Sequence, residues 1–220
     1  VGVPAVEMRN DIAGHEFAHG MPAAELRARL ADAGLKVASV NALQRFNDWT
    51  SDREAEAKSL IRYAAELGAP GLVLCPAHEP RDEWDENTKD LKLREGLRAL
   101  KPIFEDEGVI GYVEPLGMFH STMKNQSRAA AAIDDVGGRT SFALCYDTFQ
   151  YFRCSDDALF LDMVALIHVS GISRTDPAPG ELTEPDRGLV MADDRVGNID
   201  VLKRAFANGY SGFVSIEPFN

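Results

Sequence analysis

Four side chains of the types that bind metal ions occur in this chain, each directly after a short apolar run. They are Glu114, Asp147, His168 and Glu217. Such runs are typical of parallel strands covered on both faces, so a polar residue at the end of one is paired, bound to a metal or catalytic. Three carboxylates and one imidazole suit a single divalent ion, and this set does not discriminate among Mn²⁺, Mg²⁺, Co²⁺ and Zn²⁺.

The alternative for the same four residues is a set of buried ion pairs with Arg or Lys on neighbouring strands. Few basic residues occupy positions in the apolar runs, and Arg9 is the clearest of them. Buried acids without cationic partners are strongly unfavourable, so a metal ion is the better source of positive charge. We therefore expect a metal site at these strand ends.

Further polar residues lie where ligand contacts are expected. Asn41 ends one apolar run and His78 lies just past another, although the first is equally compatible with a turn and the second with a loop. The longest irregular stretch, residues 171–197, has the length of a lid or binding loop. Its charged residues Arg174, Asp186 and Arg187 are therefore candidates for ligand contact.

Residues 15–19 read His-Glu-Phe-Ala-His and match the His-Glu-x-x-His pattern of zinc proteases. That chemistry requires both histidines on one face of a helix. Gly14 precedes the motif and Gly20, Met21 and Pro22 follow it, so a loop is the better interpretation.

Seven apolar runs alternate with helical patterns, which is typical of repeated strand–helix units and a parallel sheet. The runs open near Ala5, Val37, Gly71, Val109, Phe142, Met163 and Phe213. No Gly-x-Gly-x-x-Gly turn follows a run, which favours a TIM-type (β/α)8 parallel barrel over a doubly wound sheet. We expect one domain over residues 1–220, lacking the first strand–helix unit and the last helix of a full barrel.

The composition of the chain disfavours some classes of binding partner. A formal net charge of −12 disfavours nucleic acid. The chain has neither a bilayer-length apolar run nor an initial signal segment, so we expect a cytoplasmic protein without a membrane partner. Three cysteines without Cys-x-x-Cys spacing predict reduced thiols. The sequence is compatible with a homodimer and does not determine the oligomeric state.

Five segments spread over the chain carry a family resemblance. They read VEPLGMFHSTMKN, CYDTFQYF, LIHVSGI, DRGLVMADDRVGNI and GYSGFVSIEPF. These segments resemble the xylose isomerase-like TIM-barrel superfamily of sugar isomerases and epimerases, and within it the inosose isomerase branch. The resemblance implies that Glu114, Asp147, His168 and Glu217 bind one divalent metal. It also implies that Arg187, from the loop before the last helix, contacts the substrate.

Two positions depart from the family pattern. Gln150 stands where many relatives have a histidine, and it can hydrogen-bond a sugar oxygen but cannot carry a proton at neutral pH. His120 stands where the sugar epimerases tend to have a glutamate. Both are candidate substrate contacts, and they make recognition of the substrate hydroxyls the least transferable inference.

The expected reaction is metal-assisted proton transfer next to a carbonyl, through an enediolate. Glu114 and Glu217 would be the acid–base pair, since they come from separate strands and can flank a bound substrate. An inosose isomerase is the first hypothesis and a ketose 3-epimerase the second. A sugar-binding barrel without catalysis is the alternative from another class.

Overall fold

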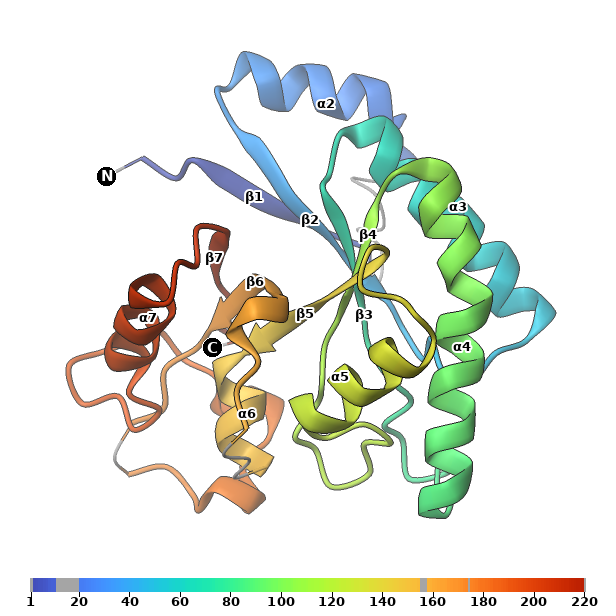
Figure 1. Ribbon diagram of the computed structural model, residues 1–220. Coiled ribbons are helices and arrows are strands. Elements are labelled where there is room, and N and C mark those ends of the chain that lie inside the picture. Colours follow the sequence, from blue (N-terminus) through green and yellow to red (C-terminus); the bar gives the residue numbers. More distant parts are fainter. Residues whose placement is uncertain (1, 11–19, 155–157, 174, 220) are drawn as a thin grey trace.

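Seven parallel strands form the centre of the protein in the computed structural model (Figure 1). The residues described are 2–10, 20–154, 158–173 and 175–219. The strands are β1 (Ala5–Arg9), β2 (Lys36–Leu43), β3 (Gly71–Leu74), β4 (Ile110–Val113), β5 (Phe142–Asp147), β6 (Val164–Val169) and β7 (Phe213–Ile216). Each pairs with the next strand in the chain, so the sheet order is the sequence order. This is the strand order of a parallel barrel.

Helices in the connections cover the outside of the sheet (Figure 1). They are α2 (Ala23–Asp32), α3 (Ser51–Leu67), α4 (Glu86–Glu107), α5 (Gln126–Asp135), α6 (Thr148–Cys154) and α7 (Asn198–Ala207), with short 3-10 turns η1 (Leu161–Met163), η2 (Pro179–Glu181) and η3 (Glu184–Asp186). Side-chain oxygens of Thr50, Asp85 and Asn125 cap α3, α4 and α5. Gly68 and Gly108 end α3 and α4 in the left-handed conformation that the sequence predicts for these glycines.

Two apolar layers hold the barrel together. The larger lies between the strands and the helices and includes Ile61, Leu97 and Ile133, all fully buried. A smaller cluster joins side chains of neighbouring strands, among them Val73 and Leu166. Alternate residues of one strand serve these two layers because successive side chains point to opposite faces.

The barrel is nearly closed, and its one seam lies between the edge strands β1 and β7 of the described sheet. Among the described residues these two strands lie at the ends of the sheet and pair only with β2 and β6. An ion pair crosses the seam at its carboxyl end, with Arg9 Nη1 2.8 Å from Glu217 Oε1. Side chains therefore join the two edges where backbone pairing is not seen.

The sequence-based expectations for the fold are largely confirmed. The described sheet is parallel and has seven strands, whereas a full TIM barrel has eight. The residues described after β7 contain no helix. The sixth strand begins at Val164, because Met163 belongs to the preceding 3-10 turn. None of the described helices combines the length and apolar character needed to cross a membrane. The His-Glu-x-x-His motif at 15–19 lies outside the described residues.

Candidate metal centre

The four predicted ligands meet at the carboxyl end of the barrel. Glu114 directly follows β4, Asp147 is the last residue of β5, His168 is near the end of β6 and Glu217 directly follows β7. Ligand atoms of all four lie within 4.8 Å of one another. Parallel strands place their ends at one edge, so adjacent strands in sequence order deliver these side chains to one point.

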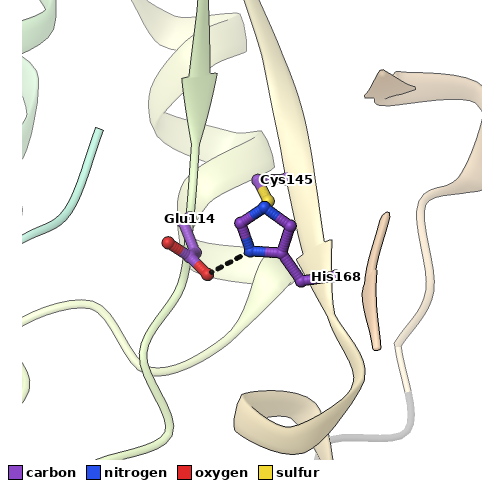
Figure 2. Close-up of side chains that lie close together, drawn as sticks. All are labelled: Glu114, Cys145 and His168. Atoms are coloured by element: carbon purple, nitrogen blue, oxygen red, sulfur yellow. Dashed lines mark hydrogen bonds and ion pairs between the residues drawn. The ribbon is translucent and has the colours of Figure 1, made fainter. Parts of the chain in front are cut away.

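One nitrogen of His168 faces the three carboxylates. Its Nδ1 atom lies 3.2 Å from Glu114 Oε1 and 3.1 Å from Glu217 Oε2, with Asp147 Oδ2 at 4.0 Å. Figure 2 shows the first of these contacts, with the His168 ring between Glu114 and Cys145. Three carboxylate groups and one imidazole nitrogen around one point fit a divalent ion of the oxygen- and nitrogen-binding kind.

Two arginines supply part of the positive charge that the site needs. Arg187 Nη2 lies 2.6 Å from Asp147 Oδ2 and 2.7 Å from Glu217 Oε2, and the residue is only 3% exposed. Arg9 approaches the other oxygen of Glu217. The ion-pair alternative therefore explains Asp147 and Glu217. Glu114 instead contacts the imidazole ring of His168.

The two glutamates of the cluster have opposite pKa shifts. Burial raises the pKa of Glu114 to about 7, reinforced by the charges of Asp147 and Glu217 and opposed by His168. Burial also acts to raise the pKa of Glu217, but His168, Arg187 and Arg9 outweigh it and lower that pKa to about 2. Glu114 is therefore the weaker acid of the two glutamates.

Glu7, in the middle of β1, contacts the second nitrogen of His168 and was missed in the sequence analysis. Its Oε1 atom lies 3.1 Å from His168 Nε2, and its side chain is 8% exposed. Burial opposes ionisation of Glu7, but the charge and hydrogen bond of His168 lower its pKa overall. The sequence signal for Glu7 is an acidic residue inside an apolar run, whereas the predicted ligands were all at the ends of such runs.

A cavity of about 310 Å³ borders the cluster at Glu114 and Glu217. Its lining includes the predicted contacts Asn41, His78, Gln150 and Arg187 together with Glu114 and Glu217. Asn41 Nδ2 donates to Glu217 Oε1 over 3.3 Å, and His78 Nδ1 lies 2.9 Å from the carbonyl oxygen of Pro76. The structure thus brings both candidates to the cavity, Asn41 from within β2, which continues to Leu43, and His78 from the loop after β3.

Gln150 reaches the cavity but is held by other protein groups. Its Oε1 atom accepts from the Gly117 amide at 2.9 Å, and its Nε2 donates to Glu184 Oε1 at 3.0 Å. Glu184, on η3, also lines the cavity and pairs with Arg153 at 2.9 Å and Arg187 at 3.1 Å. Glu184 is a second residue that the sequence analysis missed, because nothing in its loop sequence indicates which strand end it approaches.

Two other candidates are not brought to this cavity. His120 lies outside its lining, since the turn at 118–121 places the ring edge-on against the exposed Phe119, with centroids 4.9 Å apart. Asp186 lines a different hollow and caps η3 through the Thr183 amide. Arg174 lies outside the described residues.

The three cysteines lie in the described residues and no disulfide joins them. Cys75 and Cys145 are buried, and Cys154 is half-buried. Cys75 Sγ lies 3.5 Å from Glu114 Oε2, so a thiol borders the acidic cluster. Burial raises the pKa of the Cys145 thiol, which keeps it protonated.

A parallel barrel with candidate metal ligands and a cavity at the carboxyl ends of its strands has the layout of the TIM-barrel fold class. Within that fold class, the chain belongs to the xylose isomerase-like TIM barrel family, whose model matches residues 1–220. No curated protein matches the chain at a significant level.

Solved structures share this fold. A xylose isomerase domain containing protein from Salmonella typhimurium LT2 is 26% identical with a TM-score of 0.86, over 98% of this chain and 79% of that one. IolI with a bound zinc atom is 20% identical with a TM-score of 0.87, over 100% and 80%. D-psicose 3-epimerase from Clostridium cellulolyticum H10, with D-tagatose, is 18% identical with a TM-score of 0.74, over 99% and 75%.

Proposed function

We propose that the protein is a divalent-metal-dependent isomerase or epimerase of sugars or polyol ketones, with an inosose as the first candidate substrate. The observation that carries the proposal is the convergence of ligand atoms of Glu114, Asp147, His168 and Glu217 within 4.8 Å of one another. Two of these residues, Glu114 and Glu217, line a cavity. Family membership supports the same class of reaction. The fold similarity to zinc-bound IolI and to D-psicose 3-epimerase is compatible with either substrate type.

The donor set is the basis for assigning a metal. Glu114, Asp147, His168 and Glu217 would hold the ion through three carboxylates and one imidazole nitrogen. A bound divalent ion would polarise a substrate carbonyl and stabilise negative charge on its oxygen. Mn²⁺, Mg²⁺, Co²⁺ and Zn²⁺ all accept this donor set.

Proton transfer is assigned to the two glutamates. One carboxylate removes the proton from the carbon next to the carbonyl, and the other returns a proton to the neighbouring carbon or to the opposite face. Glu114 follows β4 and Glu217 follows β7, and both line the cavity, so they can reach a bound substrate from separate strands. Either glutamate can take the first proton while the other returns it.

The remaining cavity residues would orient the substrate. Arg187 is buried and anchored by three acids, so it presents its guanidinium in one position. Asn41 and His78 line the same cavity and offer hydrogen bonds to hydroxyl groups. Gln150, with both ends of its amide engaged, would act on the substrate chiefly by holding Glu184.

Deuterium exchange tests the proposed reaction directly. The metal-loaded protein is incubated with an inosose and with several ketoses in D₂O, and deuterium uptake is followed by NMR. Uptake confined to the inosose identifies the isomerase, and uptake at carbon 3 of a ketose identifies the epimerase. If no compound takes up deuterium, the catalytic proposal is wrong.

Metal dependence separates an enzyme from a sugar-binding barrel. A binding protein could keep the cavity and Arg187 and retain its affinity for sugar without an ion. The enzyme must lose turnover after EDTA treatment and recover it when a divalent metal is restored. Full turnover after exhaustive chelation would exclude the metal-dependent mechanism.

A further inference from the structure

His168 lies between two groups of side chains that act on opposite edges of its ring. Its Nδ1 atom faces Glu114 and Glu217 at 3.2 and 3.1 Å, whereas Nε2 lies 3.1 Å from Glu7 Oε1 and 3.2 Å from Glu7 Oε2. The ring is fully buried, so both nitrogens depend on these protein partners. The partner of Nε2 therefore affects what Nδ1 can bind.

A neutral imidazole carries one proton, and the nitrogen without it is the one that can bind a metal. If Nε2 donates its hydrogen to a carboxylate, Nδ1 keeps a free lone pair toward the acidic cluster. A carboxylate acceptor also makes the imidazole a stronger ligand. The contact between Glu7 and Nε2 has the arrangement that this effect requires.

Cys145 offers His168 a competing contact. Its side chain is within hydrogen-bonding reach of the His168 ring, and Figure 2 shows its sulfur beside the ring nitrogen that does not contact Glu114. A thiol that donates to Nε2 would leave the single proton on Nδ1, where it blocks a metal. An ionised carboxylate is the stronger acceptor, so Glu7 selects the opposite arrangement.

Glu7 is itself held in place from three strands. The Ser39 hydroxyl on β2 donates to Glu7 Oε2, and Ser215 on β7 adds a further hydrogen bond. With His168 on β6, these contacts cross the seam between β1 and β7, where backbone pairing is not seen among the described residues. The carboxylate is thus fixed against Nε2 by neighbours on both sides of the seam.

We propose that Glu7 is a positioning residue of the metal centre, which keeps the proton of His168 on Nε2 so that Nδ1 binds the ion. This inference rests on the proposed metal site and extends it to a residue that does not itself contact the ion. Glu7 acts through His168, and neither the substrate nor the ion needs to touch it.

Zinc affinity measured by calorimetry is the first test. Glu7→Gln keeps the volume of the side chain but removes its charge, and we expect Zn²⁺ binding to weaken by about 10- to 100-fold. Glu7→Asp keeps the charge and should recover part of the affinity. Glu66→Gln, an exposed change on α3, is the matched control and should bind like the wild type. Circular dichroism checks that each variant is folded.

The second test reads the position of the His168 proton directly. In zinc-loaded, ¹⁵N-histidine-labelled protein, we expect His168 to show a solvent-protected Nε2–H and a metal-bound Nδ1. The other histidines are distinguished by a His168→Asn sample. In Glu7→Gln the Nε2–H signal should shift upfield or exchange faster with solvent, because its acceptor is weaker.

The outcomes separate this inference from the proposed function. Either of two results would overturn the role of Glu7 and leave the metal site intact. In the first, zinc is bound through Nε2 of His168. In the second, Glu7→Gln and Glu7→Asp both match the wild-type zinc affinity within twofold. A wild-type protein that binds none of Zn²⁺, Mn²⁺ or Co²⁺ would overturn the metal site and the role of Glu7 together.

Discussion

At the scale of residues, the main contrast is between the two glutamates of the cluster. Arg9 and Arg187 flank Glu217, whereas Glu114 is buried and contacts the imidazole ring of His168. The same side-chain type is thereby given two different acid–base characters by its neighbours. Function at this scale depends on which cations approach which carboxylate.

Replacing either glutamate by Gln should therefore lower turnover strongly. We expect Glu114→Gln and Glu217→Gln each to lower kcat by about 10²- to 10⁴-fold, because an amide cannot accept the substrate proton. Gln150→Ala should cost far less, since Gln150 carries no proton. The measurement is deuterium exchange with metal occupancy determined for each variant. An equal loss in all three variants at equal occupancy would contradict the assignment.

At the scale of elements, the loops after β2 and β3 are joined by a charged contact beside the cavity. Arg45 binds Asp82 through two hydrogen bonds of 2.7 and 2.8 Å, and Asp82 is 4% exposed. The Glu79 amide donates to the same carboxylate at 2.8 Å. These loops also carry Gln44 and His78, so the contact helps to fix one wall of the cavity.

This contact predicts a pH-dependent contribution to stability. Burial opposes ionisation of Asp82, but hydrogen bonds from Arg45 and the Glu79 amide lower its pKa overall. A lowered folded-state pKa gives stability that is full above the unfolded value of about 4 and is lost as pH falls through the folded value. Asp82→Asn should thus lower the free energy of unfolding by about 1.5–3 kcal/mol at pH 7.

Urea denaturation of wild type and Asp82→Asn at pH 7 and at pH 3 or below measures this difference. The gap between the two proteins should shrink at the acidic end. Because many carboxylates titrate there, the difference between the two proteins is the informative quantity, not the stability of either. A gap that is unchanged or wider in acid would contradict the prediction.

The packing of α6 against the loop after β4 depends on Gly117. A β-carbon at this position would lie 2.1 Å from the Gln150 carbonyl oxygen and 2.9 Å from Arg153 Cβ. Backbone must then move, and α6 directly follows the candidate ligand Asp147. The fit of this element thus bears on the geometry of the metal centre.

Gly117→Ala should therefore destabilise the fold by about 1–3 kcal/mol and weaken metal binding. Gly180→Ala is the matched control, because a β-carbon there meets nothing within 4 Å. Thermal unfolding and zinc calorimetry measure the two effects. If Gly117→Ala behaves like Gly180→Ala in both measurements, the packing argument is wrong.

At the scale of the whole molecule, the candidate ligands tie together four consecutive strands, β4 to β7. An ion bound to all four would connect parts of the barrel that the unfolded chain cannot bring together. Binding to the folded state alone stabilises it by mass action. The expected gain is about 2.7 kcal/mol when free ion is at 100 times its Kd.

Unfolding followed by urea with and without Zn²⁺ tests this coupling. Asp147→Asn, which removes a ligand charge at constant volume, should lose most of the zinc-dependent gain. Zinc that stabilises the wild type and this variant equally would indicate binding elsewhere on the protein.

The sequence by itself determined the barrel and the strand ends that carry its chemistry. Apolar runs that alternate with helical patterns specify parallel strands, and parallel strands in sequence order must bring Glu114, Asp147, His168 and Glu217 to one edge. That conclusion needs only local pattern and chain direction. For the same reason Asn41 and His78 could be placed near the cavity.

Only the tertiary structure decided which side chains meet across the barrel. The contact between Glu7 and His168 joins residues on β1 and β6, and it depends on strand register and on how closely the edges of the sheet approach. The long loop likewise brings Glu184 to the cavity and leaves Asp186 outside its lining. A residue's spacing along the chain fixes its place on its own element, whereas its partners on distant elements are set by packing that no local pattern encodes.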